Sequence, residues 1–160
     1  MTDGSEISSP LEAEKLVEVS ASRPIGRSAE TTYELLRDLR RHWPMLGSDL
    51  IRARILEGSD DERAELIVGG PVPGLRRRVV TEVSRTDPPR LFEGQATADS
   101  TKALITWRID PVDELNCLVT LTATVAPGGI RDRLLVAAVG PWLDGRCRQV
   151  LERLEQELMK

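Results

Sequence analysis

The hydrophobic period of the chain changes once, and this change constrains the fold more than any other feature. Between residues 51 and 125, short segments of alternating apolar and polar residues follow one another, separated by turns such as Gly58-Ser59-Asp60-Asp61. After Pro127-Gly128-Gly129 the apolar residues recur at helical spacing as far as the C-terminus. Alternation indicates strands, and a period of about 3.6 residues indicates a helix. We therefore expect a run of strands followed by one long helix.

Seven segments have the alternation and the bounding turns of strands. The predicted strands are residues 16–22, 51–57, 62–68, 75–85, 90–97, 102–109 and 115–125. The connections between the last six are too short for crossover helices, so we expect antiparallel hairpins. Arg23-Pro24 is expected to end the first strand, because proline has no N–H to donate to a ladder. Asp110-Pro111-Val112-Asp113 is expected to be a turn between the last two strands.

Helical spacing also follows the first strand. Ser28 is an N-cap type of residue, and the apolar residues after it predict a helix that ends at His42-Trp43-Pro44, since the residue before a proline avoids the α region. A second short helix is expected at about residues 45–50. In the C-terminal helix, Gly140-Pro141 either kinks one helix or separates two, and the sequence leaves both open. The order predicts an α+β fold in which a long helix covers one face of a sheet.

The charge distribution separates a short tail from the body of the chain. The 160 residues contain 26 acidic and 22 basic side chains, and Asp3, Glu6, Glu12 and Glu14 account for the acidic excess. We expect residues 1–14 to be a disordered acidic tail and residues 15–160 to be a single domain. The formally neutral body argues against a nucleic-acid partner, which requires a basic surface.

Membrane insertion and secretion are not expected from this sequence. No apolar run approaches the length of a membrane span, and the acidic N-terminus lacks the basic and apolar regions of a signal peptide. We therefore expect a cytoplasmic protein. Two cysteines and one histidine show no metal-ligand spacing, and no phosphate or dinucleotide loop is present, so neither a metal nor a cofactor is expected.

His42, Arg77 and Thr81 are the candidate catalytic residues. His42 is the one side chain that titrates near neutrality without a shifted pKa; it is either an exposed cation at a helix C-terminus or an acid, base or hydrogen-bond donor to a ligand. Arg77 shares a strand face with Thr81, where it either meets an anionic ligand group or lies solvated at the sheet edge. Thr81 and Gln95 are candidates to orient a ligand in an apolar pocket.

The tryptophans lie on apolar faces of their elements. Trp107 shares a strand face with other apolar residues, and Trp142 lies on the apolar side of the last helix, so the two are expected to point into the space between sheet and helix. They either pack in a core or line a cavity. Arg146 interrupts the same helix face, where it extends outward, meets Glu93 or contacts a ligand.

Four stretches resemble one known superfamily in their order and spacing. They are the helix from Ser28 to Asp38, the stop at His42-Trp43-Pro44, the strand Thr106-Trp107-Arg108-Ile109-Asp110-Pro111-Val112 and the strand Leu118-Val119-Thr120-Leu121. Together they resemble the START/Bet v1-like helix-grip superfamily (SRPBCC), specifically its bacterial polyketide cyclase/dehydrase-like branch. The resemblance covers residues 16–158.

The resemblance implies a helix-grip fold and a hollow interior. A curved antiparallel seven-stranded sheet would wrap around the long C-terminal helix, with one or two short helices after the first strand. Between sheet and helix an apolar cavity would bind a hydrophobic small molecule, such as a lipid or polyketide. The leading hypothesis is binding or transport; the alternative is a polyketide cyclase, aromatase or dehydratase, and a third is a module that delivers a ligand to a partner protein. A homodimer is left open.

The candidate ligand-binding residues are the polar and aromatic residues placed above, with apolar neighbours on the same faces. They are Tyr33, Trp43, Arg77, Thr81, Phe92, Gln95, Ile105, Trp107, Val119, Ala138, Trp142 and Arg146.

Overall fold

The structure confirms the predicted order of elements. The computed structural model describes residues 16–56, 62–70, 74 and 76–160, without the side chains of residues 131 and 135–139, so the predicted tail lies outside it. The elements are β1 (Val17–Ile25), α2 (Ala29–Arg37), α3 (Leu39–His42), the 3₁₀ segment η2 (Trp43–Asp49), β2 (Leu50–Ile55), β3 (Arg63–Gly69), β4 (Arg76–Asp87), β5 (Leu91–Ala98), β6 (Thr101–Asp113), β7 (Asn116–Ala126) and α4 (Ile130–Leu158).

Two strands run further than the sequence predicted. β1 continues through Arg23-Pro24 to Ile25, because it lies at the edge of the sheet, where a proline can be tolerated. β6 continues through Asp110-Pro111-Val112-Asp113, so the expected turn at these residues is wrong. The pairing of β6 with β7 changes register between Pro111 and Asp113, an irregularity that accommodates the proline within the ladder.

The helix after β1 begins as predicted but ends earlier. The Ser28 hydroxyl accepts a hydrogen bond from the Thr31 amide at 3.1 Å, which caps α2. Asp38 leaves the helical region, with φ −84° and ψ 95°, and its carboxylate accepts a hydrogen bond from the Arg40 amide at 3.2 Å. One predicted helix is therefore two, α2 and α3, because an Asp that caps the second turns the chain between them. The predicted short helix at about 45–50 is η2.

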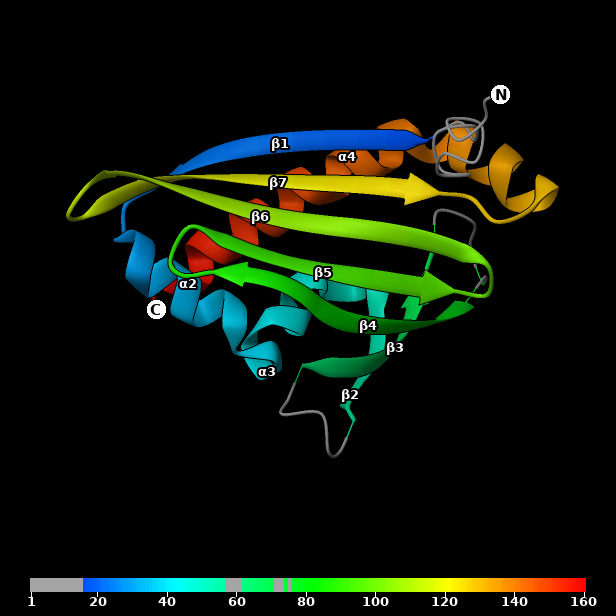
Figure 1. The fold of residues 1–160 in the computed structure, drawn as a ribbon, viewed down its shortest axis with the longest axis horizontal. Coiled ribbons are helices and arrows are strands. Elements are labelled where there is room, and N and C mark those ends of the chain that lie inside the picture. Colours follow the sequence, from blue (N-terminus) through cyan, green and yellow to red (C-terminus); the bar gives the residue numbers. More distant parts are fainter. Residues whose placement is uncertain (1–15, 57–61, 71–73, 75) are drawn as a thin grey trace, which may run out of the picture.

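All seven strands form one antiparallel sheet in the order β1-β7-β6-β5-β4-β3-β2. Figure 1 shows α4 running along one face of the sheet behind β1, β7 and β6, while β2 and β3 turn away from the plane of the other strands. A register shift between Val83 and Arg85 interrupts the pairing of β4 with β5, and such bulges bend a strand. The sheet therefore curves around a space that α4 and the short helices cover.

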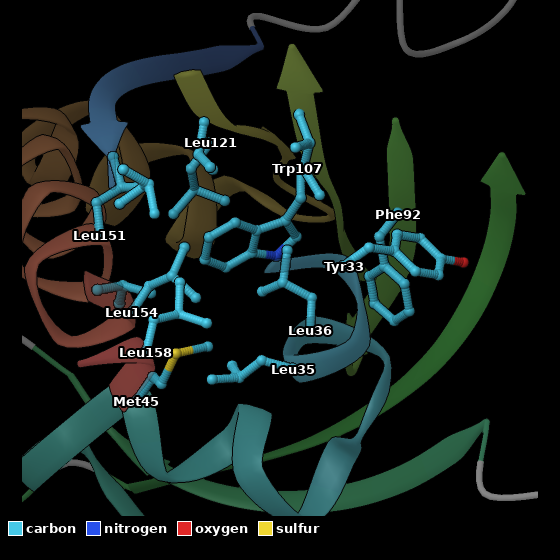
Figure 2. Packing of buried hydrophobic residues seen from close by; sticks show 14 of the residues in the cluster. Tyr33, Leu35, Leu36, Met45, Phe92, Trp107, Leu121, Leu151, Leu154 and Leu158 are labelled. Atoms are coloured by element: carbon cyan, nitrogen blue, oxygen red, sulfur yellow. The ribbon is translucent and has the colours of Figure 1, made fainter. Parts of the chain in front are cut away.

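The best-packed part of the interior lies where α4 meets the sheet and α2. Leu151, Leu154 and Leu158 of α4 approach Leu121 and Met45, and Trp107 projects between these residues and the Tyr33–Phe92 pair (Figure 2). The helix is continuous through Gly140-Pro141, so of the two geometries that the sequence left open, separate helices are excluded.

Candidate functional site

The strand register places the candidate site on the concave face. Thr81 pairs with Ala96, Val83 with Gly94 and Phe92 with Trp107. Directly paired residues of an antiparallel ladder project to the same face, so these side chains point the same way. Phe92 and Trp107 belong to the buried cluster that faces the helices, which identifies this face as the inner one.

An inner cavity of about 180 Å³ lies between this face and the short helices. Of the candidate catalytic and ligand-binding residues it brings together His42, Trp43, Thr81, Phe92, Gln95, Ile105 and Trp107. The lining also contains residues that were not predicted from the sequence. They are Leu39, Leu46, Glu62, Leu66, Val79, Glu82, Val83, Gly94 and Ala96. The described lining therefore comes from α3, η2 and strands β3 to β6, and no described α4 side chain belongs to it.

His42 is buried at the wall of this cavity. Its side chain is 7% exposed, and burial lowers its pKa from 6.5 to about 4, although the hydrogen bond to Leu36 acts in the opposite direction. Nδ1 lies 2.9 Å from the Leu36 carbonyl oxygen, which can only accept, so Nδ1 carries the proton. In the neutral ring Nε2 is then an unprotonated acceptor. The expectation of an exposed helix-terminal cation is wrong, because the chain folds His42 inward.

Aromatic rings surround the His42 imidazole. The ring centroids of Trp43, Trp107 and Phe92 lie 4.7, 5.6 and 5.8 Å from that of His42. Nε2 has no hydrogen-bond partner among the described residues, and the adjacent Trp43 Nε1–H is buried without one. Buried polar atoms are nearly always paired, so the unpaired Trp43 Nε1–H is an exception, whereas His42 Nε2 is an open acceptor that a ligand or water can satisfy.

Thr81 is the third polar group of the wall. It is 7% exposed, and its hydroxyl donates to the Ala64 carbonyl oxygen over a long 3.4 Å. A hydroxyl oxygen has two lone pairs, so Thr81 can still accept a hydrogen bond. His42 and Thr81 thus share the cavity, as their candidate roles required.

Arg77 does not join them. It faces inward, as predicted, but its guanidinium lies 3.0 Å from Asp132 at the start of α4 and 3.6 Å from Asp99. The Thr101 hydroxyl also donates to Asp132 and accepts from the Gly128 amide at 3.1 Å. This network ties the β7–α4 connection to the sheet. Arg77 is therefore neither a solvated edge residue nor a neighbour of His42 and Thr81.

Arg146 has a protein partner as well. Its guanidinium forms an ion pair with Asp49 at 2.8 Å and lies 5.3 Å from the centre of the Trp142 ring. The alternative in which Arg146 meets Glu93 is wrong. Glu93 instead accepts a hydrogen bond from Thr106 at 2.8 Å on the outer face of the sheet. Trp142 does not line the inner cavity, so Trp107 and Trp142 do not face each other across it.

The remaining predicted ligand-binding residues differ in their relation to the inner cavity. Tyr33 packs edge-on against Phe92 and borders an outer groove, and Val119 is fully buried in the core. Gln95 borders the cavity, but its side chain is exposed, since it pairs with Glu82 and Leu104 on the outer face. The side chain of Ala138 lies outside the described residues. The roles of these residues in ligand binding stay predictions.

An outer groove of about 710 Å³ adjoins the cavity. The two share Leu39, Glu62, Val83 and Phe92, and the groove also contains charged side chains of α2 and α3, among them Arg37. A charged, open groove offers less apolar surface than the inner cavity, which is therefore the better ligand site.

Neither cysteine is an activated nucleophile. Cys117 and Cys147 are buried, and burial raises the pKa of both thiols, that of Cys147 to about 11. Nucleophilic cysteines have lowered pKa values instead. Within the described residues, no cluster of His, Cys, Asp and Glu side chains could hold a metal ion, and no helix is long and apolar enough to span a membrane.

Comparison with known families and structures agrees with this geometry. Residues 17–159 match the family described as polyketide cyclase / dehydrase and lipid transport. The chain belongs to this family. No curated protein sequence matches the chain. Membership agrees with the resemblance noted in the sequence, although the family description covers both enzymes and carriers.

Solved structures establish the helix-grip fold of this family member. A Thermus thermophilus protein is 24% identical, with a TM-score of 0.71, covering 89% of this chain and 97% of that one. The Zhui aromatase/cyclase from a Streptomyces species is 17% identical, with a TM-score of 0.70 and coverage of 91% and 94%. A START superfamily protein from Mycobacterium smegmatis is 19% identical, with a TM-score of 0.64 and coverage of 87% and 97%. At these identities the similarity concerns the fold alone.

Proposed function

We propose that the protein binds a hydrophobic small molecule in the inner cavity. The observation that carries this proposal is the composition of the cavity wall: apolar and aromatic side chains with a few inward polar atoms, chiefly those of His42 and Thr81. Ligand sites typically combine an apolar lining with a few placed polar groups. The family description, which includes lipid transport, and the aromatase/cyclase named among the similar structures support the same class of ligand.

The cavity volume limits what is enclosed. An apolar cavity of about 150 Å³ admits benzene, whereas pockets for drug-sized ligands begin near about 300 Å³. A cavity of about 180 Å³ therefore holds one ring with a few further atoms, or the end of a longer ligand whose remainder extends toward the adjoining outer groove.

A polyketide cyclase-type or dehydratase-type enzyme is the second candidate. The observation that favours it is the neutral His42 ring, whose Nε2 is free to accept a proton from a bound molecule. Two features weigh against it. A pKa of about 4 makes His42 a weak base, since effective general bases have pKa values near the working pH. Arg77, one of the three candidate catalytic residues, is paired with Asp132 away from His42. Binding is therefore the stronger proposal.

Native mass spectrometry of the purified protein, combined with thermal unfolding in the presence of apolar compounds, tests the proposal. We expect either a co-purified small molecule or a melting temperature that rises with ligand concentration, because a ligand that binds only the folded state stabilises it. A folded protein that carries no extra mass and whose melting temperature is unchanged by single-ring and bicyclic compounds would contradict it. The cytoplasmic location and the homodimer stay predictions.

A further inference from the structure

The described lining of the inner cavity offers no cation to an anionic ligand. No Lys or Arg belongs to the described lining. Of its two acidic residues, Glu62 is exposed at the rim, whereas the Glu82 side chain lies on the outer face, 3.7 Å from Arg63. His42 is neutral at physiological pH, since its pKa is about 4. An anionic head group placed in this cavity would lose its hydration without gaining a cation, and the Glu62 carboxylate lies at the rim. Burying a charge without a partner is costly.

The two inward-facing arginines do not supply the missing cation to the inner cavity. Arg77 is held by Asp132 at 3.0 Å and Arg146 by Asp49 at 2.8 Å. Neither arginine lines the cavity. Recruiting either one to a ligand carboxylate or phosphate would require breaking an existing ion pair and moving its guanidinium to a different part of the interior.

The inner wall offers hydrogen bonds to a neutral donor. Because the Leu36 carbonyl fixes the proton of His42 on Nδ1, Nε2 accepts a hydrogen bond and cannot donate one. A ligand O–H satisfies this acceptor. A hydroxyl is the smallest neutral group that supplies such a donor.

Resting on the proposed function, we propose that the cavity selects an uncharged ring that carries a hydroxyl group, such as a phenol, and excludes carboxylates and phosphates. The ring stacks among the aromatic side chains Trp43, Phe92 and Trp107, and the hydroxyl donates to His42 Nε2. The cavity volume of about 180 Å³ suits a ring of this size.

Three probes of matched shape test the selectivity at neutral pH: 4-ethylphenol, ethylbenzene and 4-ethylbenzoate, each titrated by ligand-observed NMR. We expect 4-ethylphenol to bind about fivefold more tightly than ethylbenzene, which corresponds to one net hydrogen bond. We expect 4-ethylbenzoate to bind at least about 100-fold more weakly than the phenol, because its charge finds no partner.

His42→Phe tests the assigned acceptor. The variant keeps a ring at the cavity wall but removes Nε2, so it should lose the preference for phenol over ethylbenzene while still binding ethylbenzene. Thr106→Val is the control, because it removes a hydroxyl on the outer face of the sheet, outside both the inner cavity and the outer groove, and it should leave the preference unchanged. If His42→Phe does not fold, the order of the three affinities for the unmodified protein decides the question.

The outcomes separate this inference from the proposed function. If none of the three probes binds, the proposed function fails and the selectivity fails with it. If ethylbenzene binds as tightly as the phenol, or 4-ethylbenzoate binds equally well, the cavity binds ligands but the inferred selectivity is overturned. A phenol preference that survives in His42→Phe overturns the role of His42.

Discussion

One curved sheet covers two interior regions that differ in packing. Where the C-terminal half of α4 lies over the sheet, Leu154, Val119 and Ile109 are completely inaccessible to solvent. Where α3 and η2 lie over strands β3 to β5, the wall encloses the inner cavity instead. The same sheet thus covers a solid core at one place and a hollow at another.

The difference arises from side-chain size and from the length of the cover. In the hollow region β5 presents Gly94 and Ala96 inward, whereas in the solid region β7 presents Val119 and Leu121. The solid region is covered by a long helix with leucines at helical spacing. The hollow region is covered by one short helical turn and a 3₁₀ segment, which supply few side chains. Small residues under a short cover leave space, so the hollow is a property of this sequence and not only of the fold.

Truncating one leucine in each region should give the largest difference. Leu154→Ala leaves a void in close-packed surroundings and should lower the free energy of unfolding by about 4 kcal/mol. Leu66→Ala, at the cavity wall, should cost about 2 kcal/mol, since part of its surface already faces empty space. Urea unfolding of both variants measures this. Equal losses, or a larger loss at Leu66, would contradict the contrast between the regions.

Much of the fold was predictable from the sequence, for identifiable reasons. Alternation and turn residues locate all seven strands, five of them to within two positions at each end, and the change of period at Pro127-Gly128-Gly129 locates α4. The errors have local causes: edge position lets β1 include Pro24, and Asp38 acts as a cap that divides a helix. Strand faces were also predictable, since Arg77 and Thr81 do point inward.

The site was predictable only in part, because it depends on partners far apart in the chain. The pairing of Arg77 with Asp132 and that of Arg146 with Asp49 join different elements, and no local pattern encodes them. The burial of His42 follows from the tertiary position of α3. Gly94 and Ala96 were not predicted as lining residues, because the sequence does not show that a small residue borders a cavity until its register with β4 and β6 is known.

Acidification should destabilise the hollow region through His42. Its pKa is 6.5 when unfolded and about 4 when folded, so between these values the unfolded state binds more protons. The contribution of the neutral His42 ring to the free energy of unfolding is fully present above about pH 6.5. It is lost as the pH falls toward 4, and the total loss is about 3 kcal/mol. The difference in unfolding free energy between the unmodified protein and His42→Phe, measured across this range, isolates the effect from the carboxylates. Parallel pH profiles would show that His42 titrates normally.

Adding side-chain volume in each region should give a smaller but sharper contrast. Ala123→Ile forces extra atoms into the solid core, where Ala123 is 3% exposed, and should cost about 2 kcal/mol. Ala96→Ile places the same atoms in the cavity, so it should cost less than about 1 kcal/mol and abolish ligand binding. Thermal unfolding and probe titration of both variants test this. Full ligand binding in a folded Ala96→Ile variant would place the ligand elsewhere.

The central claim, that ligand enters the hollow region under α3 and η2, is tested most directly by tryptophan emission. Trp107 lines the inner cavity, and Trp142 lies outside it against Arg146. With 4-ethylcyclohexanol, which is transparent at the excitation wavelength, we predict an emission change that persists in Trp142→Phe and is largely lost when Trp43 and Trp107 are both replaced by Phe, because both line the inner cavity. A change that persists in this double variant and disappears in Trp142→Phe would contradict the account, because the ligand would then lie against α4 rather than in the hollow.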